Sequence, residues 1–317
     1  MAHQTSPTKL ETNASIDGPE PNPDFTTAAP LADLVSVRPH RTDTFHGLGH
    51  AGAPKRVMGG QVAAQALAAA GATVDADRVP HSLHGYFLRE GRPDQIIEYH
   101  VERSRDGRTY SARQVAAVQD GSEIFVMTAS FVRPTADSER HLVAPVVPAP
   151  DTAPDMYDVW RSLHPEAYAE AVYAGAIEAR IVPRPTGPTA PDSDGAVRQD
   201  IWLRSRHPLP DDPLVHACAL TYLSDSTLAQ SSAIEHEVMY PLRREPGRVG
   251  LASIDHSVWF HRSLRADDWL LLRQASISIA SRRGFNQGSF WSPNGTMVAS
   301  AAQESVVRLL SNTKDEK

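Results

Sequence analysis

The pattern of hydrophobic and polar positions occurs twice along the chain. In the first half, the alanine-rich segment GGQVAAQALAAAGA predicts a helix, and four segments of strand-like alternation follow it: HSLHGYFLR, QIIEYHVERSR, TYSARQVAAVQ and EIFVMTASFV. In the second half, PLVHACALTYLSDSTLA predicts a helix, and strand-like segments again follow: ASIDHSVWFHR, WLLLRQASISIA, FNQGSFWS and TMVASAAQESVVRL. Each half therefore predicts one long helix and an antiparallel sheet.

The two halves align over their strands with almost no insertion. Tyr86 begins YFLR and Trp259, 173 positions later, begins WFHR, whereas the turn residues Gly121 and Gly295 lie 174 positions apart. A duplicated α+β unit is the simplest account of this spacing. We expect each sheet to wrap around its helix and the two units to pair edge to edge into one continuous sheet.

The segments outside this repeat divide the chain further. Residues 1–30 are polar and proline-rich without periodicity, which predicts a flexible tail. We expect an N-terminal unit over residues 31–135, a linker with a helical piece over 136–178, and a C-terminal unit over 179–312 that carries the candidate catalytic residues. A polar segment at 236–248 is inserted after the second helix, and its role is open.

Composition and charge restrict the class of protein. The 317 residues are 41% hydrophobic and 22% charged, as in ordinary folded proteins. A net charge of -7 argues against nucleic acid or an anionic membrane as the main partner. Cys218 is the only cysteine, which excludes an intramolecular disulfide and suits a reducing compartment. Since no apolar run approaches 18 residues, we expect a cytoplasmic protein without membrane insertion.

Common enzyme motifs are missing from the chain. There is no G-x-S-x-G, no phosphate-binding G-x-x-x-x-G-K-[ST], no G-x-G-x-x-G and no H-E-x-x-H. The 14 histidines show no converging carboxylate pattern, so we expect no metal site. The run Ser253-Ile254-Asp255-His256 holds the residue types of a serine triad. In a regular strand, however, Ser253 and Asp255 face one way and His256 the other, which excludes a triad within this run.

Asp225 is a candidate general base. On a helix it shares one stripe with Leu214, Cys218 and Thr221, the face expected to pack on the sheet. A partly desolvated carboxylate suits proton abstraction. The alternative is that the Ser-Asp-Ser-Thr run around Asp225 only ends one helix and caps another.

Two further positions carry candidate polar groups. Gln303 interrupts an apolar strand, whereas its counterpart in the first half is Ala129. This difference suggests that one copy kept a site, although an amide in a strand also serves structural hydrogen bonding. Gly60 and Gln61 open the first helix, where unpaired backbone N–H groups can hold a developing oxyanion. The alternative there is an ordinary helix start.

Several segments closely resemble the type II acyl-CoA thioesterases, the bacterial thioesterase II group with peroxisomal relatives. The similar segments occur in the same order: RVMGGQVAAQAL, HSLHGYFLREG, RDGRTYSARQVAAVQDGSEIFVMTASF, YLSDS, ASIDHSVWFHR, SRRGF and AAQESVVR. They extend over about residues 31–308 and are weakest in the linker. The resemblance implies a double hot dog, an α+β fold of two helix-in-sheet units. It also implies hydrolysis of acyl-CoA to free fatty acid and CoA, with neither metal nor cofactor.

The resemblance also implies roles for single residues. The catalytic Asp of Y-x-S-D falls on Asp225, the Gln of V-Q-E-x-V on Gln303, and the residue before I-D-H-S on Ser253, where many bacterial members carry Thr. Asp225 would take a proton from water that Ser253 and Gln303 orient, without a covalent acyl-enzyme. A helix-start amide, that of Gly60 or Gln61 by analogy with other hot-dog enzymes, would stabilise the thioester oxyanion.

Substrate contacts are less constrained by the sequence. Arg113, Arg282 and Arg283 are candidates to bind the CoA phosphates, with a solvated surface role as the alternative. Four apolar side chains are candidates to line an acyl channel, with a place in the ordinary core as the alternative: Met58, Phe87, Met127 and Trp259. We expect medium- or long-chain substrates and a homo-oligomer, a dimer or a tetramer.

Two other functions are compatible with the fold. A hot-dog hydratase or dehydratase would place a His five residues after the helix Asp, but Gln230 occupies that position. A non-catalytic acyl-CoA-binding sensor needs no water-activating set, so the presence of Asp225, Ser253 and Gln303 argues against it.

Overall fold

The structure is a computed structural model. It describes residues 29–49, 56–93, 95–135, 138–163, 165, 175–184, 192–233 and 249–309. Residues 1–28 of the expected tail and the whole of the 236–248 segment lie outside these ranges.

The N-terminal half consists of one long helix and a set of antiparallel strands. Its helices are α1 (Leu31–Leu34) and α2 (Gly59–Gly71), and its strands are β1 (Arg38–Arg41), β2 (Thr44–Leu48), β3 (Val79–Phe87), β4 (Ile96–Asp106), β5 (Tyr110–Gln119) and β6 (Ser122–Val132). The helix α2 and the strands β3 to β6 are the elements that the periodicity predicts.

The C-terminal half repeats this arrangement with additions. A short η2 (Pro150–Thr152) and α3 (Met156–Leu163) precede its long helix α5 (Pro213–Asp225), which η4 (Leu228–Ala233) follows. The strands are β7 (Ile177–Ile181), β8 (Val197–Ser205), β9 (Val249–Ser253), β10 (Asp255–Phe260), β11 (Leu270–Ala280), β12 (Arg283–Trp291) and β13 (Met297–Leu309). Both η4 and β9 lie between α5 and β10, where the first half has only a short turn between α2 and β3.

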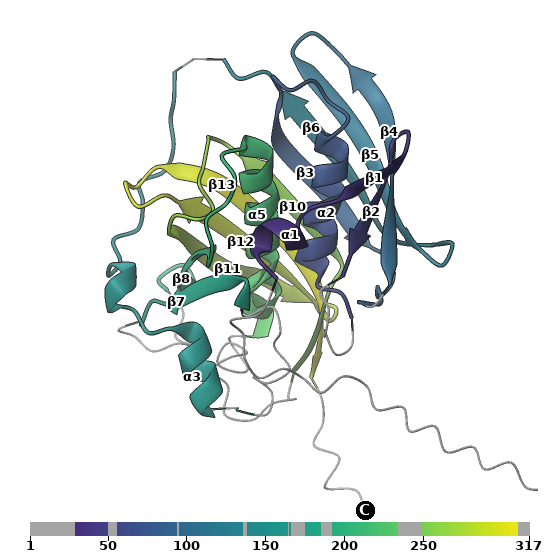
Figure 1. Cartoon of the computed structure of the whole chain (residues 1–317). Coiled ribbons are helices and arrows are strands. Elements are labelled where there is room, and N and C mark those ends of the chain that lie inside the picture. Colours follow the sequence, from purple (N-terminus) through teal and green to yellow (C-terminus); the bar gives the residue numbers. More distant parts are fainter. Residues whose placement is uncertain are drawn as a thin grey trace, which may run out of the picture.

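All the described strands belong to one sheet. Their order is β1-β2-β4-β5-β6-β3-β10-β13-β12-β11-β8-β7, with β9 alongside β13. The two halves meet where β3 pairs with β10, and His84 there lies opposite Ser257, which is 173 positions later in the sequence. Equivalent residues of the repeat therefore face each other at the centre of the sheet. The expected continuous sheet is confirmed (Figure 1).

The two long helices pack against each other on the inner face of the sheet (Figure 1). They run antiparallel, because Gly60 at the start of α2 contacts Asp225 at the end of α5, and Gly71 at the end of α2 contacts Leu214. Half of the buried residues of α2 are alanines, which lets the helix axes approach closely. The catalytic candidates thus lie where the N-terminal end of one helix meets the C-terminal end of the other.

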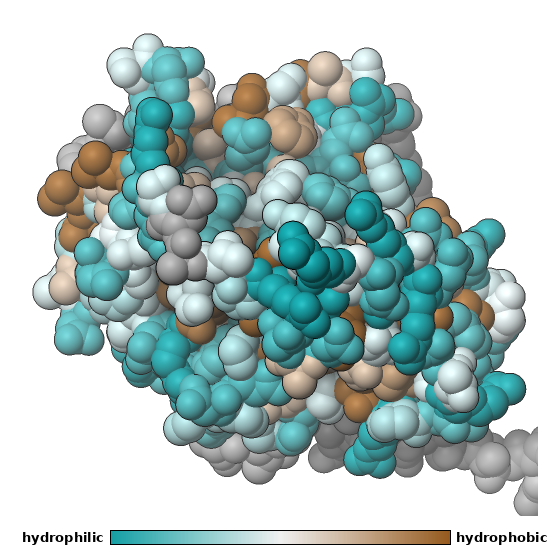
Figure 2. Space-filling model, turned by 90° about the horizontal axis from the view of Figure 1, so that it is seen from above, coloured by the Kyte–Doolittle hydropathy of each residue, from teal (hydrophilic) through white to brown (hydrophobic). Residues whose placement is uncertain are grey.

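The core lies between these helices and the sheet. Its strands contribute fully buried side chains on alternate positions, such as Phe125, Phe131 and Val258, and α5 contributes Leu220 and Leu223. The surface in Figure 2 mixes hydrophilic and hydrophobic residues in small groups. Among the described residues, no helix has the length and apolar character needed to cross a membrane.

Candidate active site

The candidate site begins with the way in which α5 is positioned. Asp212 precedes the helix and caps it, since its Oδ1 accepts a hydrogen bond from the Leu214 N–H at 2.8 Å. The buried stripe that follows includes Cys218 and Thr221, which are almost completely inaccessible to solvent. This stripe fixes the rotation of the helix, so Asp225 at its last turn lies partly buried beside α2.

Asp225 is held at both carboxylate oxygens. Its Oδ1 accepts a hydrogen bond from the Gln303 Nε2 on β13 at 2.6 Å. Its Oδ2 accepts the backbone N–H of Gly60 on α2, also at 2.6 Å. Two elements from different halves of the chain therefore fix the plane of one carboxylate.

The contact with Gly60 has a second consequence, for the helix α2. Met58 precedes this helix and provides no side-chain cap, although the first N–H groups of a helix need acceptors. Asp225 supplies that acceptor from another element, at the position that an N-capping side chain normally serves. The alternative interpretation from the sequence, that Asp225 caps a helix, is therefore partly correct. The helix that it caps is α2.

Gln303 also reaches the third predicted residue. Its Nε2 donates to the Ser253 Oγ at 3.2 Å, so one amide group bridges the carboxylate and the hydroxyl. Gln303 is completely buried, whereas Asp225 and Ser253 are partly exposed. The structure therefore brings together all three residues, from α5, β9 and β13.

Ser253 faces this site because of an irregularity in its strand. Ser253 lies opposite Ser305 and Ser257 lies opposite Ala302, so four steps along one chain match three along the other. The extra residue is a β-bulge between β9 and β10, which re-aims the side chains around it. The expectation that Ser253 and His256 face opposite ways is therefore wrong, since both point to the inner side of the sheet.

No serine triad results from this. The His256 Nε2 pairs with the Ser224 Oγ at 2.8 Å, and the Asp255 Oδ1 accepts the Glu304 backbone N–H at 2.6 Å. Burial lowers the pKa of His256 from its usual value, against the opposing effect of Asp225 and Asp255, and this favours the neutral ring. Sequence reasoning gave Ser224 and His256 no role, because only the bulge brings the histidine ring to the inner face.

Comparison with known proteins identifies the family to which the chain belongs. Residues 50–132 match the family model of the acyl-CoA thioesterase N-terminal domain, and residues 146–307 match that of the C-terminal domain. The chain belongs to the acyl-CoA thioesterase family. Its two units, each a helix wrapped by antiparallel strands, form the double hot dog that the resemblance implied.

Individual relatives cover most of the chain. Acyl-coenzyme A thioesterase 8 of Homo sapiens is 31% identical over 90% of this chain and 91% of its own length. Acyl-CoA thioesterase 2 of Haemophilus influenzae is 33% identical over 80% of this chain and 88% of its own. The crystal structure of an acyl-CoA thioesterase II from Mycobacterium marinum has a TM-score of 0.72 and 35% identity, and covers 89% of this chain and 99% of that one.

The two amides predicted to form an oxyanion hole are already engaged in this member of the family. The Gly60 N–H donates to Asp225, and the Gln61 N–H donates to the Met58 carbonyl at 3.1 Å. The Gln61 side chain is buried as well, with its amide donating to the carbonyls of Leu34 and Leu48. The oxyanion role of Gln61 therefore stays a prediction, and the partner of the Gly60 N–H in this structure is the Asp225 carboxylate.

Arg113 is not available to a phosphate. Its side chain is 1% exposed, and its guanidinium donates to Thr73, to Asp106 and to the carbonyls of Arg105 and Ala112. The predicted role in CoA binding is therefore wrong, since all five N–H groups of its guanidinium donate to partners inside the N-terminal unit.

Arg282 lies in the exposed hairpin turn between β11 and β12, and Arg283 is the first residue of β12. Ser281 and Arg282 adopt positive φ angles of 50° and 62°, which is the backbone of a tight two-residue turn. The Arg283 Nε pairs with the Glu304 Oε1 at 2.8 Å. Because Gly284 lies opposite Ser305, which in turn lies opposite Ser253, the hairpin is at the same end of the sheet as the site.

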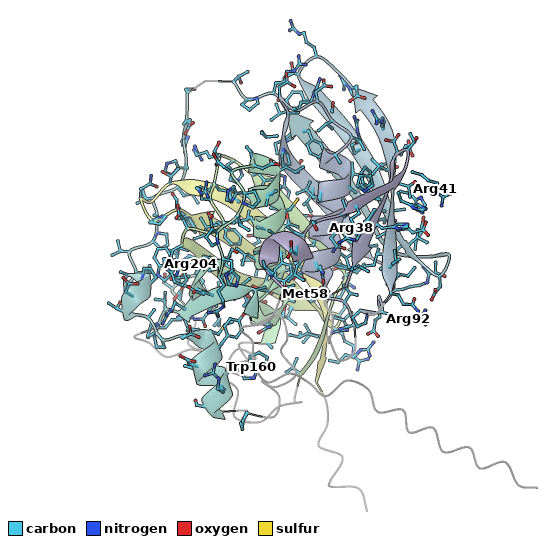
Figure 3. The ribbon with its side chains drawn as sticks, in the orientation of Figure 1. Arg38, Arg41, Met58, Arg92, Trp160 and Arg204 are labelled. Atoms are coloured by element: carbon cyan, nitrogen blue, oxygen red, sulfur yellow. The ribbon has the colours of Figure 1, made fainter. Side chains whose placement is uncertain are left out.

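The apolar candidates divide into two groups. A side chain at Gly59 would contact the ring of Phe87 and the Asp225 carboxylate, so Phe87 lies beside the site. Met58 immediately precedes α2, is partly buried and packs against the main core (Figure 3). Met127 is buried in the core, and Trp259 is 37% exposed, with its ring against His84. Only Met58 and Phe87 remain candidates to contact an acyl chain.

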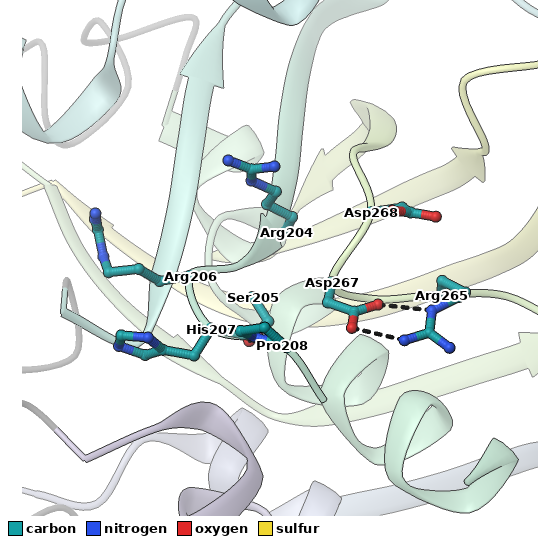
Figure 4. A pocket seen from close by; sticks show the side chains of 8 residues that line it. All are labelled: Arg204, Ser205, Arg206, His207, Pro208, Arg265, Asp267 and Asp268. Atoms are coloured by element: carbon teal, nitrogen blue, oxygen red, sulfur yellow. Dashed lines mark hydrogen bonds and ion pairs between the residues drawn. The ribbon is translucent and has the colours of Figure 1, made fainter. Parts of the chain in front are cut away.

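A basic hollow elsewhere on the protein has its charges neutralised. It lies beside the start of α5 and is lined by Arg204, Arg206 and Arg265 (Figure 4). Arg204 and Arg206 pair with Glu178 at 2.6 and 3.7 Å, and Arg265 pairs with Asp267 at 2.8 Å. We assign this hollow no ligand. Within the described ranges, no three His, Cys, Asp or Glu side chains converge as metal ligands.

Proposed function

We propose that the protein hydrolyses acyl-CoA thioesters to a free fatty acid and CoA. The observation that carries this proposal is a carboxylate, Asp225, fixed at both oxygens and joined through Gln303 to the hydroxyl of Ser253. Such a set can bind and deprotonate one water molecule. The names of the relatives, which are acyl-CoA thioesterases, supply the class of substrate.

The reaction proceeds by direct attack of water on the thioester. Asp225 takes one proton from the water, whose oxygen forms a bond to the thioester carbonyl carbon. The tetrahedral intermediate then collapses, the C–S bond breaks, and CoA leaves as a thiolate that takes up the proton. Because a thiolate is a good leaving group, the protein need supply little acid assistance.

Each neighbour of Asp225 has a defined part in this mechanism. The Gln303 amide orients the carboxylate and bonds to Ser253, whose hydroxyl holds the water in line with the carbonyl carbon. Gly60 holds the other carboxylate oxygen through its backbone N–H. The absence of a side chain at Gly60 allows that approach, because an added Cβ would lie 2.7 Å from the Asp225 Cβ.

Substrate binding is proposed at the same end of the sheet. Arg282 and Arg283 on the β11–β12 hairpin provide cations for the CoA phosphates. Phe87 provides apolar surface beside the carboxylate, and Met58 lies two residues before Gly60, which favours medium- or long-chain acyl groups.

Exchanging both Arg282 and Arg283 for glutamine is expected to raise KM for acyl-CoA without lowering kcat. An unchanged KM would remove these two arginines from the site.

Two alternative functions lack a supporting observation. A hydratase would place a His where Gln230 stands, and the Gln230 amide donates to the Ser226 carbonyl at 3.4 Å. A sensor would need affinity for acyl-CoA but no fixed carboxylate and no hydroxyl for a water.

Release of CoA tests the proposed function. With a thiol reagent, the wild-type protein is expected to release CoA from one or more acyl-CoAs in a series from acetyl to palmitoyl. Binding of the same acyl-CoAs without release at any chain length would contradict hydrolysis and favour the sensor.

We also propose a cytoplasmic homo-oligomer. Exposed aromatic side chains at the centre and flank of the outer sheet face, Tyr86, Tyr110 and Trp259, support association of two or more copies. A mass of 34.5 kDa in light scattering, equal to one chain, would contradict the oligomer. Cys218 is buried and unpaired, which suits the cytoplasm, and cell fractionation tests that location.

A further inference from the structure

Two buried polar atoms beside the site have no hydrogen-bond partner among the described residues. They are the Nδ1 of His256 and the Oε1 of Gln303. Both side chains are completely inaccessible to solvent. Buried polar groups are normally paired, so two orphaned atoms in one place require an explanation.

The two side chains are neighbours on adjacent strands. Ser257 of β10 pairs with Ala302 of β13. His256 and Gln303 are the next residues on the two strands, so we infer that they lie side by side. Both face the inner side of the sheet, and opposite residues of an antiparallel pair have their Cβ atoms about 5 Å apart. The orphaned atoms therefore belong to one small region next to Asp225.

The proton on Ser224 determines which nitrogen of His256 is protonated. The Ser224 Oγ lies 2.9 Å from the Thr221 carbonyl and 2.8 Å from the His256 Nε2, and a hydroxyl donates only one proton. If it donates to Thr221, then Nε2 carries the ring proton, and Nδ1 and the Gln303 Oε1 are two buried acceptors without a donor. If it donates to Nε2, then Nδ1–H is a donor in the same region as the acceptor Oε1. Only the second arrangement allows the orphaned atoms to be joined.

We propose that His256 is a positioning residue, whose Nδ1–H fixes the orientation of the Gln303 amide so that Nε2 faces Asp225. One bridging water or a small rotation of the side chains joins Nδ1–H to Oε1. The reverse orientation of the amide would bring Oε1 against the Asp225 carboxylate, where two acceptors repel. The chain of donors runs from Ser224 to His256, then to Gln303, and ends at Asp225 and Ser253. This inference rests on the proposed function for its kinetic consequences.

Two substitutions of His256 separate its two nitrogens. In His256→Asn, the amide nitrogen lies near the position of Nδ1 and can still donate toward Gln303. In His256→Gln, the amide lies near the position of Nε2 and keeps only the contact with Ser224. We expect His256→Asn to keep kcat within about threefold of wild type and His256→Gln to lower kcat at least roughly tenfold, with little change in KM.

A double-mutant cycle with Gln303 distinguishes positioning from general support of the fold. If His256 acts through Gln303, then His256→Gln adds no further loss of kcat in a Gln303→Ala background. An additive loss would overturn the proposal, as would wild-type kcat in His256→Gln. Equal losses of kcat and of Tm in the Asn and Gln variants would overturn it too, because they would indicate a structural role.

A measurement on the wild-type protein does not depend on the variants or on catalysis. Nitrogen-15 NMR of histidine-labelled protein, with His256 assigned through His256→Asn, is expected to show a protonated Nδ1 and an unprotonated Nε2. The opposite tautomer would overturn the proposal. A protein that released no CoA at all would contradict the proposed function, while this tautomer would still be measured.

Discussion

Asp225 combines a structural role, as the cap of a neighbouring helix, with its proposed role as the catalytic base. Its carboxylate ends α5, caps α2 through the Gly60 N–H, and receives the Gln303 amide at the other oxygen. Sequence reasoning found Asp225, Gln303 and Ser253 from a helix stripe, a broken repeat and a family resemblance. It could not find the pairing with Gly60, because nothing in a sequence shows which helix starts meet which helix ends. Arg113 was misjudged for a related reason, since burial of a long cationic side chain depends on partners distant in sequence.

Ser253 permits a test at the level of one hydroxyl. Ser253→Ala removes the oxygen that accepts from Gln303 and holds the water, so we expect kcat to fall roughly tenfold or more. Ser253→Thr keeps the hydroxyl and is expected to retain kcat within about threefold. Steady-state kinetics of CoA release measure both. An alanine variant as active as wild type would remove Ser253 from the mechanism.

At the scale of elements, the sequence predicted the long helices and the main strands correctly, because their periodicities are strong. It failed at the junction of β9 and β10, where alternation across Ser253 and His256 implied opposite faces. One extra residue in the ladder turned both side chains inward. A bulge of this kind leaves no periodic signal in the sequence. It nevertheless determines which side chains of the strand face the site.

The crossing of α2 and α5 gives a matched pair of substitutions. In Gly60→Ala the new Cβ would lie 2.7 Å from the Asp225 Cβ and 2.9 Å from the Tyr222 carbonyl oxygen, so the carboxylate must move. We expect kcat to fall at least roughly tenfold. In Gly71→Ala the three atoms nearest to the new Cβ all belong to the Leu214 side chain, which can move. That variant is expected to lose stability but to keep kcat within about twofold.

Kinetics and thermal unfolding of both variants check this pair. If Gly71→Ala lost as much kcat as Gly60→Ala, then the effect would come from helix packing in general rather than from the position of Asp225.

At the scale of the whole molecule, one sheet contains both halves, and the proposed site uses residues from each of them. Gly60 belongs to the first half, and Asp225, Ser253 and Gln303 belong to the second. The segment between α5 and β10 has no counterpart in the first half, and it carries η4 and β9 with Ser253. The duplication therefore explains the scaffold, and the insertion explains why Ser253 occurs in only one copy.

Buried histidines make the stability of the whole molecule sensitive to acid. Burial lowers the pKa of His216 and His256 below the usual value, so the unfolded state binds more protons than the folded state near that pH. The free energy of unfolding is therefore expected to fall as the pH drops below about 6.5. Urea unfolding at pH 7.5, 6.5 and 5.5 measures this change.

His216→Asn provides the control for the acid effect. The asparagine side chain can still accept the Ala266 N–H that His216 Nδ1 accepts at 3.2 Å, but it does not titrate. A weaker dependence on pH in this variant is expected. An equal dependence would show that the other titrating groups cause the loss.

The central claim is that Asp225 is the base that activates water. The measurement is kcat for CoA release by Asp225→Asn beside wild type, with Asp212→Asn as the control on the same helix. Asn keeps the capping role at 212, so that variant is expected to retain full activity. Asp225→Asn is expected to fold and to lose about 100-fold or more in kcat. A folded Asp225→Asn protein with the wild-type rate would contradict the account.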